Sequence, residues 1–168
     1  DRITDLKTIY GPLIDFYERQ GFVECRGFDG RTTIGETEIT AIPVDRGCQT
    51  SFVYVFKKKG MKIVYASCDI KPFPEHRDEV KKPNILVIQP GIFEKGLKHG
   101  FRYPANHISR TTLYTFEETL ALARRLKADQ VLFVHIEEYW NRGYDDYTAI
   151  EKNLKNMRFA RDGMRVTI

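Results

Sequence analysis

The stretch TFEETLALARRLKADQVLFVHIEE, residues 115–138, joins an amphipathic helix to a short apolar strand. Thr115 is followed three residues later by Glu118, a spacing typical of a capping box, and this predicts that the helix begins here. The apolar run VLFV, residues 131–134, is short enough for a buried strand. His135 follows that strand directly, and acidic residues follow the histidine. An imidazole is therefore expected at the end of a core strand, a position where ligands collect in layered folds.

The order of the other elements predicts a layered α/β domain. We expect helices from about Pro12 to Arg19 and from about Asp145 to Asn156. The expected strands are residues 22–27, 38–44, 52–57, 62–66, 84–89 and 131–134, with two short strands around the Asp162–Gly163 turn. The sequence KKKG between the third and fourth strands is typical of a hairpin. Strands that first follow in hairpin order and later alternate with helices favour an α/β fold with a mixed sheet.

The composition is that of a soluble globular protein with a single domain, residues 1–168. The chain is 42% hydrophobic and 30% charged, which argues against wholesale disorder. No apolar run approaches the roughly 18 residues that span a bilayer, so no membrane partner is expected. The first residues, DRITDLKTIY, lack the features of a signal peptide and an initiator Met, so the domain is expected to be N-terminally incomplete.

Charge and cysteine content indicate the compartment and limit the partners. The net charge of +4 is mild, and the positive runs at Lys57–Lys59 and Arg124–Arg125 are short. These runs are typical of a solvated surface, with a face that attracts nucleic acid or phosphate as the alternative. Three widely spaced cysteines argue against a disulfide framework or a zinc ribbon. They favour a reducing, cytoplasmic location.

Polar residues that follow expected strands are the first candidates for chemistry. Asp69 follows the strand KIVYASC, His135 follows QVLFV, and Asp45 and Arg46 follow EITAIPV. Loops at strand ends converge on one crevice in layered α/β folds. A carboxylate with an imidazole is a ligand pair that suits zinc, and the acidic residues after His135 would orient its free ring nitrogen. The alternatives are that Asp69 forms a turn or caps a helix, and that His135 is a hydrogen-bonded structural residue.

A second histidine, His107, lies in a loop shortly before the capping box. The preceding residues 90–106 contain three Gly and two Pro and are predicted to form a long loop. Loops of that length in compact domains are often functional. Because an unperturbed imidazole titrates near pH 6.5, His107 is a candidate general acid or base.

The combined pattern resembles the metallo-β-lactamase superfamily. The likeness covers roughly Ile34 to the end, and its most specific pieces are VYASCDI, NHIS with FEETLALARRL, LFVHI and ARDGM. It is greatest to a branch of metal-dependent phosphodiesterases that cleave cyclic phosphates, with ribonuclease Z and pyrroloquinoline-quinone-associated proteins as relatives. The resemblance implies an αββα sandwich, of which the C-terminal two thirds are represented and a second sheet is required.

The same resemblance implies roles for individual residues. Asp69 falls on the carboxylate that bridges two metal ions, and His135 on a ligand of the second metal. His107 falls on a histidine that serves as general acid or substrate contact. The cofactor implied is Zn2+ or Mn2+, one or two ions.

The chain also departs from the family pattern. The family motif His-x-His-x-Asp-His, which supplies four ligands, is absent, although DRITDL at the start aligns with its tail when Asp1 is the carboxylate and Arg2 replaces a histidine. Arg46 stands where a further histidine ligand is expected after IPVD. Because arginine does not deprotonate in proteins, Arg46 is unable to ligate a metal, but it is suited to bind phosphate in a bidentate manner.

Two functions from different classes follow. The first is a metal-dependent hydrolase of the phosphodiesterase type, with Asp69 and His135 as metal ligands, His107 as proton donor and a small phosphate ester or cyclic phosphate as substrate. The second is a non-catalytic phosphate- or nucleotide-binding member in which Arg2 and Arg46 replace the metal charge. RNA binding by analogy with ribonuclease Z is a third option, and a homodimer is a further expected partner state.

Overall fold

The computed structural model describes residues 2–46 and 49–167, and the side chains of residues 7–44 and 51–167. The chain forms two compact units, Asp1–Thr32 and Thr33–Ile168, and each is described by itself. Among the described residues, no helix is both long and apolar enough to cross a bilayer. The expectation of a single domain over 1–168 stays a prediction.

The first unit consists of a kinked helix and an extended segment. Helix α1 (Arg2–Arg19) has a non-helical backbone at Tyr10, directly before Gly11 and Pro12. The kink agrees with the sequence, because the proline ring conflicts with a straight helix at this point. Glu18 accepts hydrogen bonds from Lys7 Nζ at 2.7 Å and from the backbone N–H of Cys25 at 3.1 Å, so its pKa is lowered by these donors.

The strand expected at residues 22–27 is wrong. This segment has no regular secondary structure, and Phe22 and Val23 are exposed, Phe22 by 73%. Its apolar side chains suggested a buried strand, but a strand forms only where a neighbouring strand takes its backbone hydrogen bonds.

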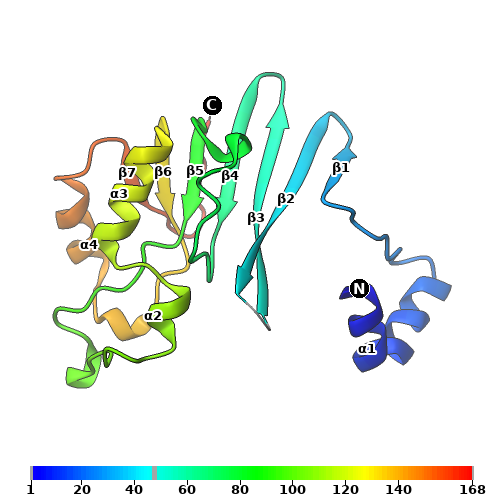
Figure 1. Cartoon of the computed structure of the whole chain (residues 1–168), viewed down its shortest axis with the longest axis horizontal. Helices are drawn as coiled ribbons and strands as arrows, with labels where there is room; N and C mark the ends of the chain where they lie inside the picture. Colours follow the sequence, from blue (N-terminus) through cyan, green and yellow to red (C-terminus); the bar gives the residue numbers. More distant parts are fainter. Residues whose placement is uncertain (1, 47–48, 168) are drawn as a thin grey trace. The chain divides into compact units, whose positions relative to one another are not determined.

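The second unit is built on a mixed sheet, as expected, with the order β1-β2-β3-β4-β5-β6-β7 (Figure 1). Its strands are β1 (Arg31–Ile34), β2 (Thr37–Arg46), β3 (Gln49–Lys58), β4 (Met61–Ala66), β5 (Ile85–Ile88), β6 (Gln130–Phe133) and β7 (Met157–Phe159). Strands β2, β3 and β4 pair antiparallel, whereas β4, β5, β6 and β7 pair parallel. The KKKG hairpin is confirmed between β3 and β4, where Lys59 and Gly60 both have positive φ angles.

Helices connect and cover the parallel strands. The remaining elements are η1 (Asp78–Val80), η2 (Lys98–Gly100), α2 (Ser109–Thr112), α3 (Phe116–Leu126), η3 (Glu138–Trp140) and α4 (Tyr144–Glu151). The capping box is confirmed, because Thr115 and Glu118 exchange both side-chain-to-backbone hydrogen bonds at the start of α3. Helix α4 ends five residues earlier than expected. Of the two strands expected around Asp162–Gly163, the first is confirmed as β7 and the second is wrong, because residues 160–167 form no strand.

The hydrophobic core lies between one face of the sheet and these helices. Alternate residues of the sheet, such as Val55, Val64, Leu86 and Phe133, are almost fully buried, as are members of α3 and η3. Val55 and Val64 are partners across β3 and β4, so they share a face of the sheet. Burial of these side chains accounts for most of the favourable free energy of the fold.

The opposite face of the sheet carries aromatic side chains that are only half-buried. Phe52, Tyr54 and Phe56 alternate along β3, and their ring centroids are 6.2 and 6.5 Å apart. Tyr65 of β4 pairs with Tyr54 and is 40% exposed. The strands of the described residues thus form one layer, with helices packed on one of its faces.

Gly91 allows the chain after β5 to pass close to the segment before α3. Ile92 N donates to Tyr114 O at 2.7 Å, and Phe116 N donates to Ile92 O at 3.2 Å. Gly91 has a φ of +88°, and a Cβ atom at this position would collide with the carbonyl oxygen of Tyr114. Gly91 therefore allows both the positive φ angle and the close approach of the Tyr114 carbonyl group.

We expect Gly91→Ala to lower the free energy of unfolding by about 3 kcal/mol or more, because strain at positive φ adds to a backbone collision. The control is Gly96→Ala, since Gly96 has a φ of +74° but open space around its Cβ position. It should cost only about 1–2 kcal/mol. Urea unfolding followed by circular dichroism measures both, and equal losses would contradict the collision.

Candidate active site

The parallel pairing of β4, β5 and β6 brings two predicted site residues to one edge of the sheet. Asp69 follows β4 by three residues, and His135 follows β6 by two. The Nδ1 atom of His135 lies 3.2 Å from the carbonyl oxygen of Ser67, which belongs to the loop that carries Asp69. The structure thus joins the ends of two strands that are separated in the sheet by β5.

Both predicted residues have a left-handed backbone. The φ angle is +51° at Asp69 and +58° at His135. This conformation is uncommon for residues other than glycine, and such strained positions concentrate at functional sites. The conformation also occurs at ordinary turns and helix ends of the described residues, such as Lys59 and Lys127, so it does not by itself mark a site.

The imidazole of His135 contacts hydrogen-bond acceptors through both of its nitrogens. Because a carbonyl oxygen only accepts, Nδ1 donates its proton to Ser67 O. The other nitrogen, Nε2, lies 3.2 Å from Oε1 of Glu137. An acidic residue therefore contacts the ring, but through Nε2, the nitrogen that would face a bound cation, whereas the contact that orients the other nitrogen comes from Ser67.

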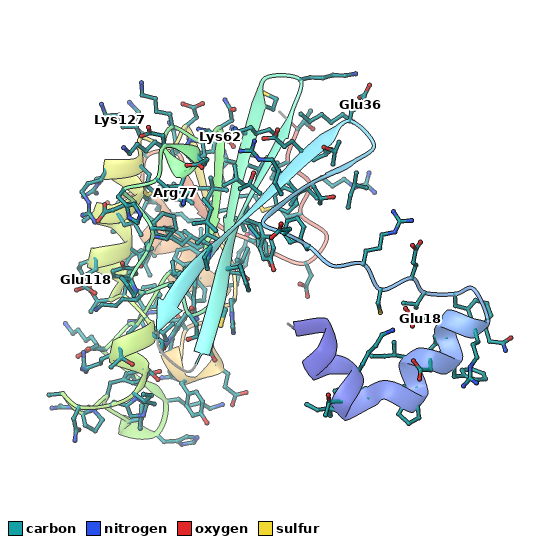
Figure 2. All side chains as sticks on the ribbon, turned by 45° about the vertical axis from the view of Figure 1, so that its right-hand side comes forward. Glu18, Glu36, Lys62, Arg77, Glu118 and Lys127 are labelled. Carbon is teal, nitrogen blue, oxygen red and sulfur yellow. The ribbon has the colours of Figure 1, made fainter. Side chains whose placement is uncertain are left out.

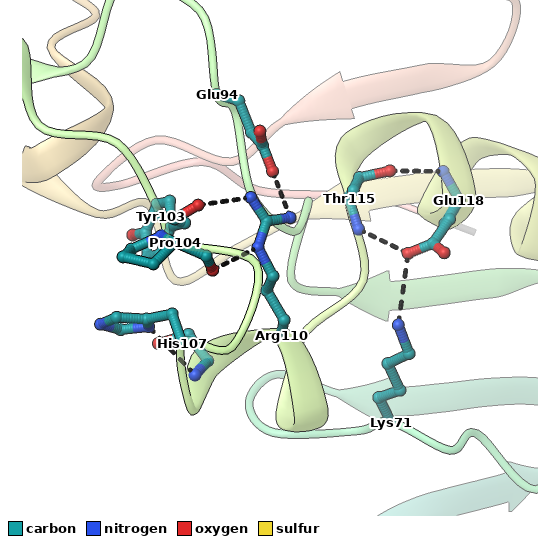
Figure 3. Close-up of polar contacts among 9 residues, drawn as sticks. Lys71, Glu94, Tyr103, Pro104, His107, Arg110, Thr115 and Glu118 are labelled. Atoms are coloured by element: carbon teal, nitrogen blue, oxygen red, sulfur yellow. Dashed lines mark hydrogen bonds and ion pairs between the residues drawn. The ribbon is translucent and has the colours of Figure 1, made fainter.

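The loop that carries Asp69 is fastened to the segment that follows His107. Lys71 N donates to Thr112 O at 3.1 Å, and Phe73 N donates to the hydroxyl of Tyr114 at 2.8 Å. The Nζ atom of Lys71 also lies 3.6 Å from Glu118 at the start of α3 (Figure 3). These contacts hold the loop after β4 and the loop before α3 at one side of the unit.

His107 precedes α2, and its hydrogen bond defines its tautomer. The backbone N–H of Ser109 donates to Nδ1 of His107 at 3.2 Å (Figure 3). Because a backbone amide only donates, Nδ1 carries no proton in this arrangement. A neutral His107 therefore has its proton on Nε2, which makes that atom a hydrogen-bond donor.

Arg110 secures the loop in which His107 lies. Its guanidinium donates to the carbonyl oxygens of Tyr103 at 2.7 Å and Pro104 at 2.9 Å, and it lies 2.5 Å from Oε1 of Glu94 (Figure 3). The carboxylate raises the pKa of Arg110 through this hydrogen bond. One side chain of α2 thereby joins two parts of the long loop after β5.

A cavity of roughly 410 Å³ lies beside His107. Its lining includes Phe101, Tyr103, His107 and Tyr139, and it also includes Glu137, the partner of His135. Glu137 is thus the physical link between the strand edge and the cavity. Glu137 joins His135 to the cavity beside His107. Lys71 joins the loop of Asp69 to the segment that follows His107.

The metal-binding capacity of this edge is incomplete among the described residues. No group of three or more His, Cys, Asp or Glu side chains there is placed to hold a metal ion. Nε2 of His135 and Oε1 of Glu137 are separated by 3.2 Å. Two ligand atoms about 2.1 Å from a tetrahedral zinc ion are roughly 3.4 Å apart. This pair resembles adjacent ligands, but the described residues on their own do not make a metal centre.

Other predicted site residues lie outside the described part. Asp1 is not described, and the side chains of Arg2, Asp45 and Arg46 are not described either. The phosphate-binding role of Arg46 therefore stays a prediction, as do the metal-binding roles of Asp69 and His135.

Gln89 is a residue at this edge that the sequence did not single out. It directly follows β5, between the strands that Asp69 and His135 follow, and its backbone N–H donates to Ala66 O at 3.2 Å. The side chain is buried, and its Oε1 has no hydrogen-bond partner among the described residues. The sequence does not predict that the Gln89 side chain is buried, because its burial depends on the neighbouring strands.

The lysine run at the β3–β4 hairpin is partly neutralised. Glu36, in the turn between β1 and β2, lies 3.4 Å from Lys58 and 3.2 Å from Lys59 (Figure 2). Glu38 lies 3.6 Å from Lys57. These pairs favour a solvated surface for the run over a face that attracts nucleic acid.

Comparison with known proteins places the chain in a family. The sequence family described as "Beta-lactamase superfamily domain" matches residues 8–136. A search of curated proteins gives no match.

Several solved structures resemble the chain. A diphosphatase from the PhnP family is 18% identical, with a TM-score of 0.64 over 97% of this chain and 54% of its own. The metallo-beta-lactamase fold protein YhfI from Bacillus subtilis is 15% identical, with a TM-score of 0.57 over 89% and 60%. Zn(2+)-bound PqqB from Methylobacterium extorquens is 11% identical, with a TM-score of 0.62 over 96% and 62%. At these identities the likeness shows the fold, and the chain spans less than two thirds of each relative.

We expect Arg110→Met to loosen the loop around His107, because the carbonyl groups of Tyr103 and Pro104 lose their donor. Amide hydrogen exchange of residues 101–108 should become about fivefold faster or more. The control is Arg77→Met, which breaks only the exposed pair with Glu79 and should leave this loop unchanged. Equal exchange of the loop in both variants would show that Arg110 does not hold it.

Proposed function

The chain belongs to the beta-lactamase superfamily domain family, and from that premise we propose that it serves a metal-dependent hydrolase of small phosphate esters, of the phosphodiesterase type. The proposal assigns metal binding to Asp69 and His135 and a substrate contact to His107. A bound divalent cation would supply positive charge against the phosphate and a reactive hydroxide at neutral pH.

The observation that carries the proposal is the convergence at the carboxyl edge of β4 and β6. The hydrogen bond from His135 to Ser67 fixes the ring orientation, as backbone carbonyls do for metal-binding histidines. The proposal requires further ligands, because Asp69, His135 and Glu137 do not form a complete centre among the described residues.

The metal part of the proposal is tested with purified protein. We expect bound zinc or manganese, measured by inductively coupled plasma mass spectrometry, and metal-dependent cleavage of bis(4-nitrophenyl) phosphate. Asp69→Ala should remove the metal and lower the rate about 100-fold or more. The control is Asp162→Ala, an exposed aspartate in the last turn, which should retain both.

Metal content below about 0.2 ion per chain, unchanged in Asp69→Ala, would exclude catalysis by this chain alone. The alternative function would then apply, in which the fold binds phosphate without catalysis. Binding of a mononucleotide that persists with EDTA and is lost in Arg46→Ala supports that alternative. The structural observation in its favour is that the residues described here hold only an incomplete set of ligands.

The tautomer of His107 favours one form of its proposed role. Full proton transfer to a leaving oxygen requires a protonated imidazole, and a proton on Nδ1 would break the hydrogen bond from Ser109 N. A neutral ring instead donates a hydrogen bond from Nε2 without releasing its proton. We therefore assign His107 as a hydrogen-bond donor to a phosphate or leaving-group oxygen.

His107→Ala should lower kcat/KM about 100-fold, the usual loss for one well-placed donor. His107→Asn should recover part of that loss, because its amide also donates. The loss should be similar for alkyl and 4-nitrophenyl esters, since no proton is transferred to the leaving group. A much larger loss for the alkyl esters, together with loss of the alkaline-side limb of the pH–rate profile, would make His107 a general acid instead.

A further inference from the structure

The cavity beside His107 has a wall of aromatic rings to which the proposed chemistry assigns no role. Phe101 and Tyr103 come from the loop after η2, and Tyr139 comes from η3. Phe101 is 38% exposed and Tyr139 is 57% exposed. Large rings that remain open to solvent around a cavity are available to contact a ligand.

The rings touch one another and form a continuous surface. The centroid of Phe101 lies 4.9 Å from that of Tyr103 and 6.2 Å from that of Tyr139. The imidazole of His107 stands edge-on to both neighbours, 5.2 Å from Tyr103 and 6.1 Å from Phe101. The donor assigned above is therefore part of the same wall.

The wall is held in place by contacts behind it. Lys98 of η2 pairs with Glu138 of η3 at 2.6 Å, which lowers the pKa of that carboxyl. Trp140, the residue after Tyr139, is fully buried and packs on Phe93 with centroids 5.2 Å apart. Arg110 donates a hydrogen bond to the carbonyl oxygen of Tyr103. A braced, partly exposed ring surface loses little freedom when a ligand binds to it.

The spacing of the rings distinguishes between two kinds of ligand. A cation held between facing rings lies up to about 6 Å from each centroid, so such rings stand well apart. Here neighbouring centroids are 4.9 to 6.2 Å apart, which leaves no space between them. The planes of Phe101 and Tyr103 meet at 81°, and those of Phe101 and Tyr139 at 44°. A planar ring stacked on one exposed face of this wall fits the geometry, because aromatic surfaces stack on any π-face.

We propose that this cavity is a subsite for a planar aromatic group of the substrate, so that the phosphate ester carries a nucleobase or another aryl ring. The cavity of roughly 410 Å³ is within the usual range for small ligands. Glu137 lines it and also contacts His135, so a ring in the cavity places an attached phosphate toward the strand edge. The assignment of the phosphate end rests on the proposed function, whereas the binding of the ring does not.

The test is a nuclear magnetic resonance titration of the whole chain in excess EDTA, with no hydrolysis required. The probes are AMP, phenyl phosphate, ribose 5-phosphate and phosphocholine. AMP should bind about tenfold more tightly than ribose 5-phosphate, because only AMP has a ring that stacks. Phenyl phosphate that matches AMP indicates any aryl ring, and preference for AMP alone indicates a nucleobase.

Variants identify the wall as the site. Tyr139→Ala should weaken AMP binding about tenfold or more and leave ribose 5-phosphate unchanged. Tyr139→Phe keeps the ring and should bind AMP as the original chain does. Tyr144→Ala removes another exposed ring, 59% exposed and paired with Arg161, and should have no effect. Because Tyr139 is exposed, its truncation leaves the core intact.

Three results would overturn the subsite: equal affinity for AMP and ribose 5-phosphate, tighter binding of phosphocholine than of AMP, or equal losses in Tyr139→Ala and Tyr139→Phe. Ring-dependent binding in a chain without metal or hydrolysis would retain the subsite and reject the hydrolase. Metal-dependent hydrolysis without any ring preference would do the reverse.

Discussion

Parallel pairing of β4, β5 and β6 is the constraint on which the candidate site depends. Strands that run the same way end at the same edge, so the segments that carry Asp69 and His135 meet although 66 positions separate these residues along the chain. The hydrogen bond from His135 to Ser67 then converts proximity into a defined ring orientation. An antiparallel arrangement of the same strands would place one of the two residues at the opposite edge. The N-terminal hairpins of the sheet supply core and width, and the parallel half supplies the site.

This half of the fold is also the part that the sequence predicts best. The capping box at Thr115, the apolar run of β6 and the KKKG hairpin are local signals, because each depends on residues a few positions apart. The placement of His135 follows from the same reasoning, since a residue directly after a core strand must lie at a sheet edge. The expected contact of an acidic residue with its ring is present in Glu137, two positions later.

The features that the sequence does not predict depend on contacts between distant segments. Residues 22–27 have the composition of a strand but no partner strand, and pairing is not visible in composition. The aromatic wall joins Phe101 to Tyr139, 38 positions apart, across two irregular loops whose course no periodic pattern describes. The same applies to Arg110, whose hydrogen bonds reach back to Tyr103 and Pro104 and whose ion pair reaches Glu94. A loop expected to be functional from its length alone thus acquires a shape only through these long-range contacts.

The two histidines of the candidate site are distinguished by the backbone groups that they contact. A carbonyl oxygen at His135 requires a proton on Nδ1, and its other nitrogen lies 3.2 Å from a carboxylate oxygen of Glu137. A backbone amide at His107 requires a bare Nδ1, so its other nitrogen carries a proton. Nδ1 is therefore a hydrogen-bond donor at His135 and an acceptor at His107. Under the proposed function, His107 would donate to the negative phosphate oxygens, and a cation at His135 would add the positive charge that the reaction calls for. Local backbone geometry thus gives the two histidines opposite roles at Nδ1, which is why the proposed function assigns them different tasks.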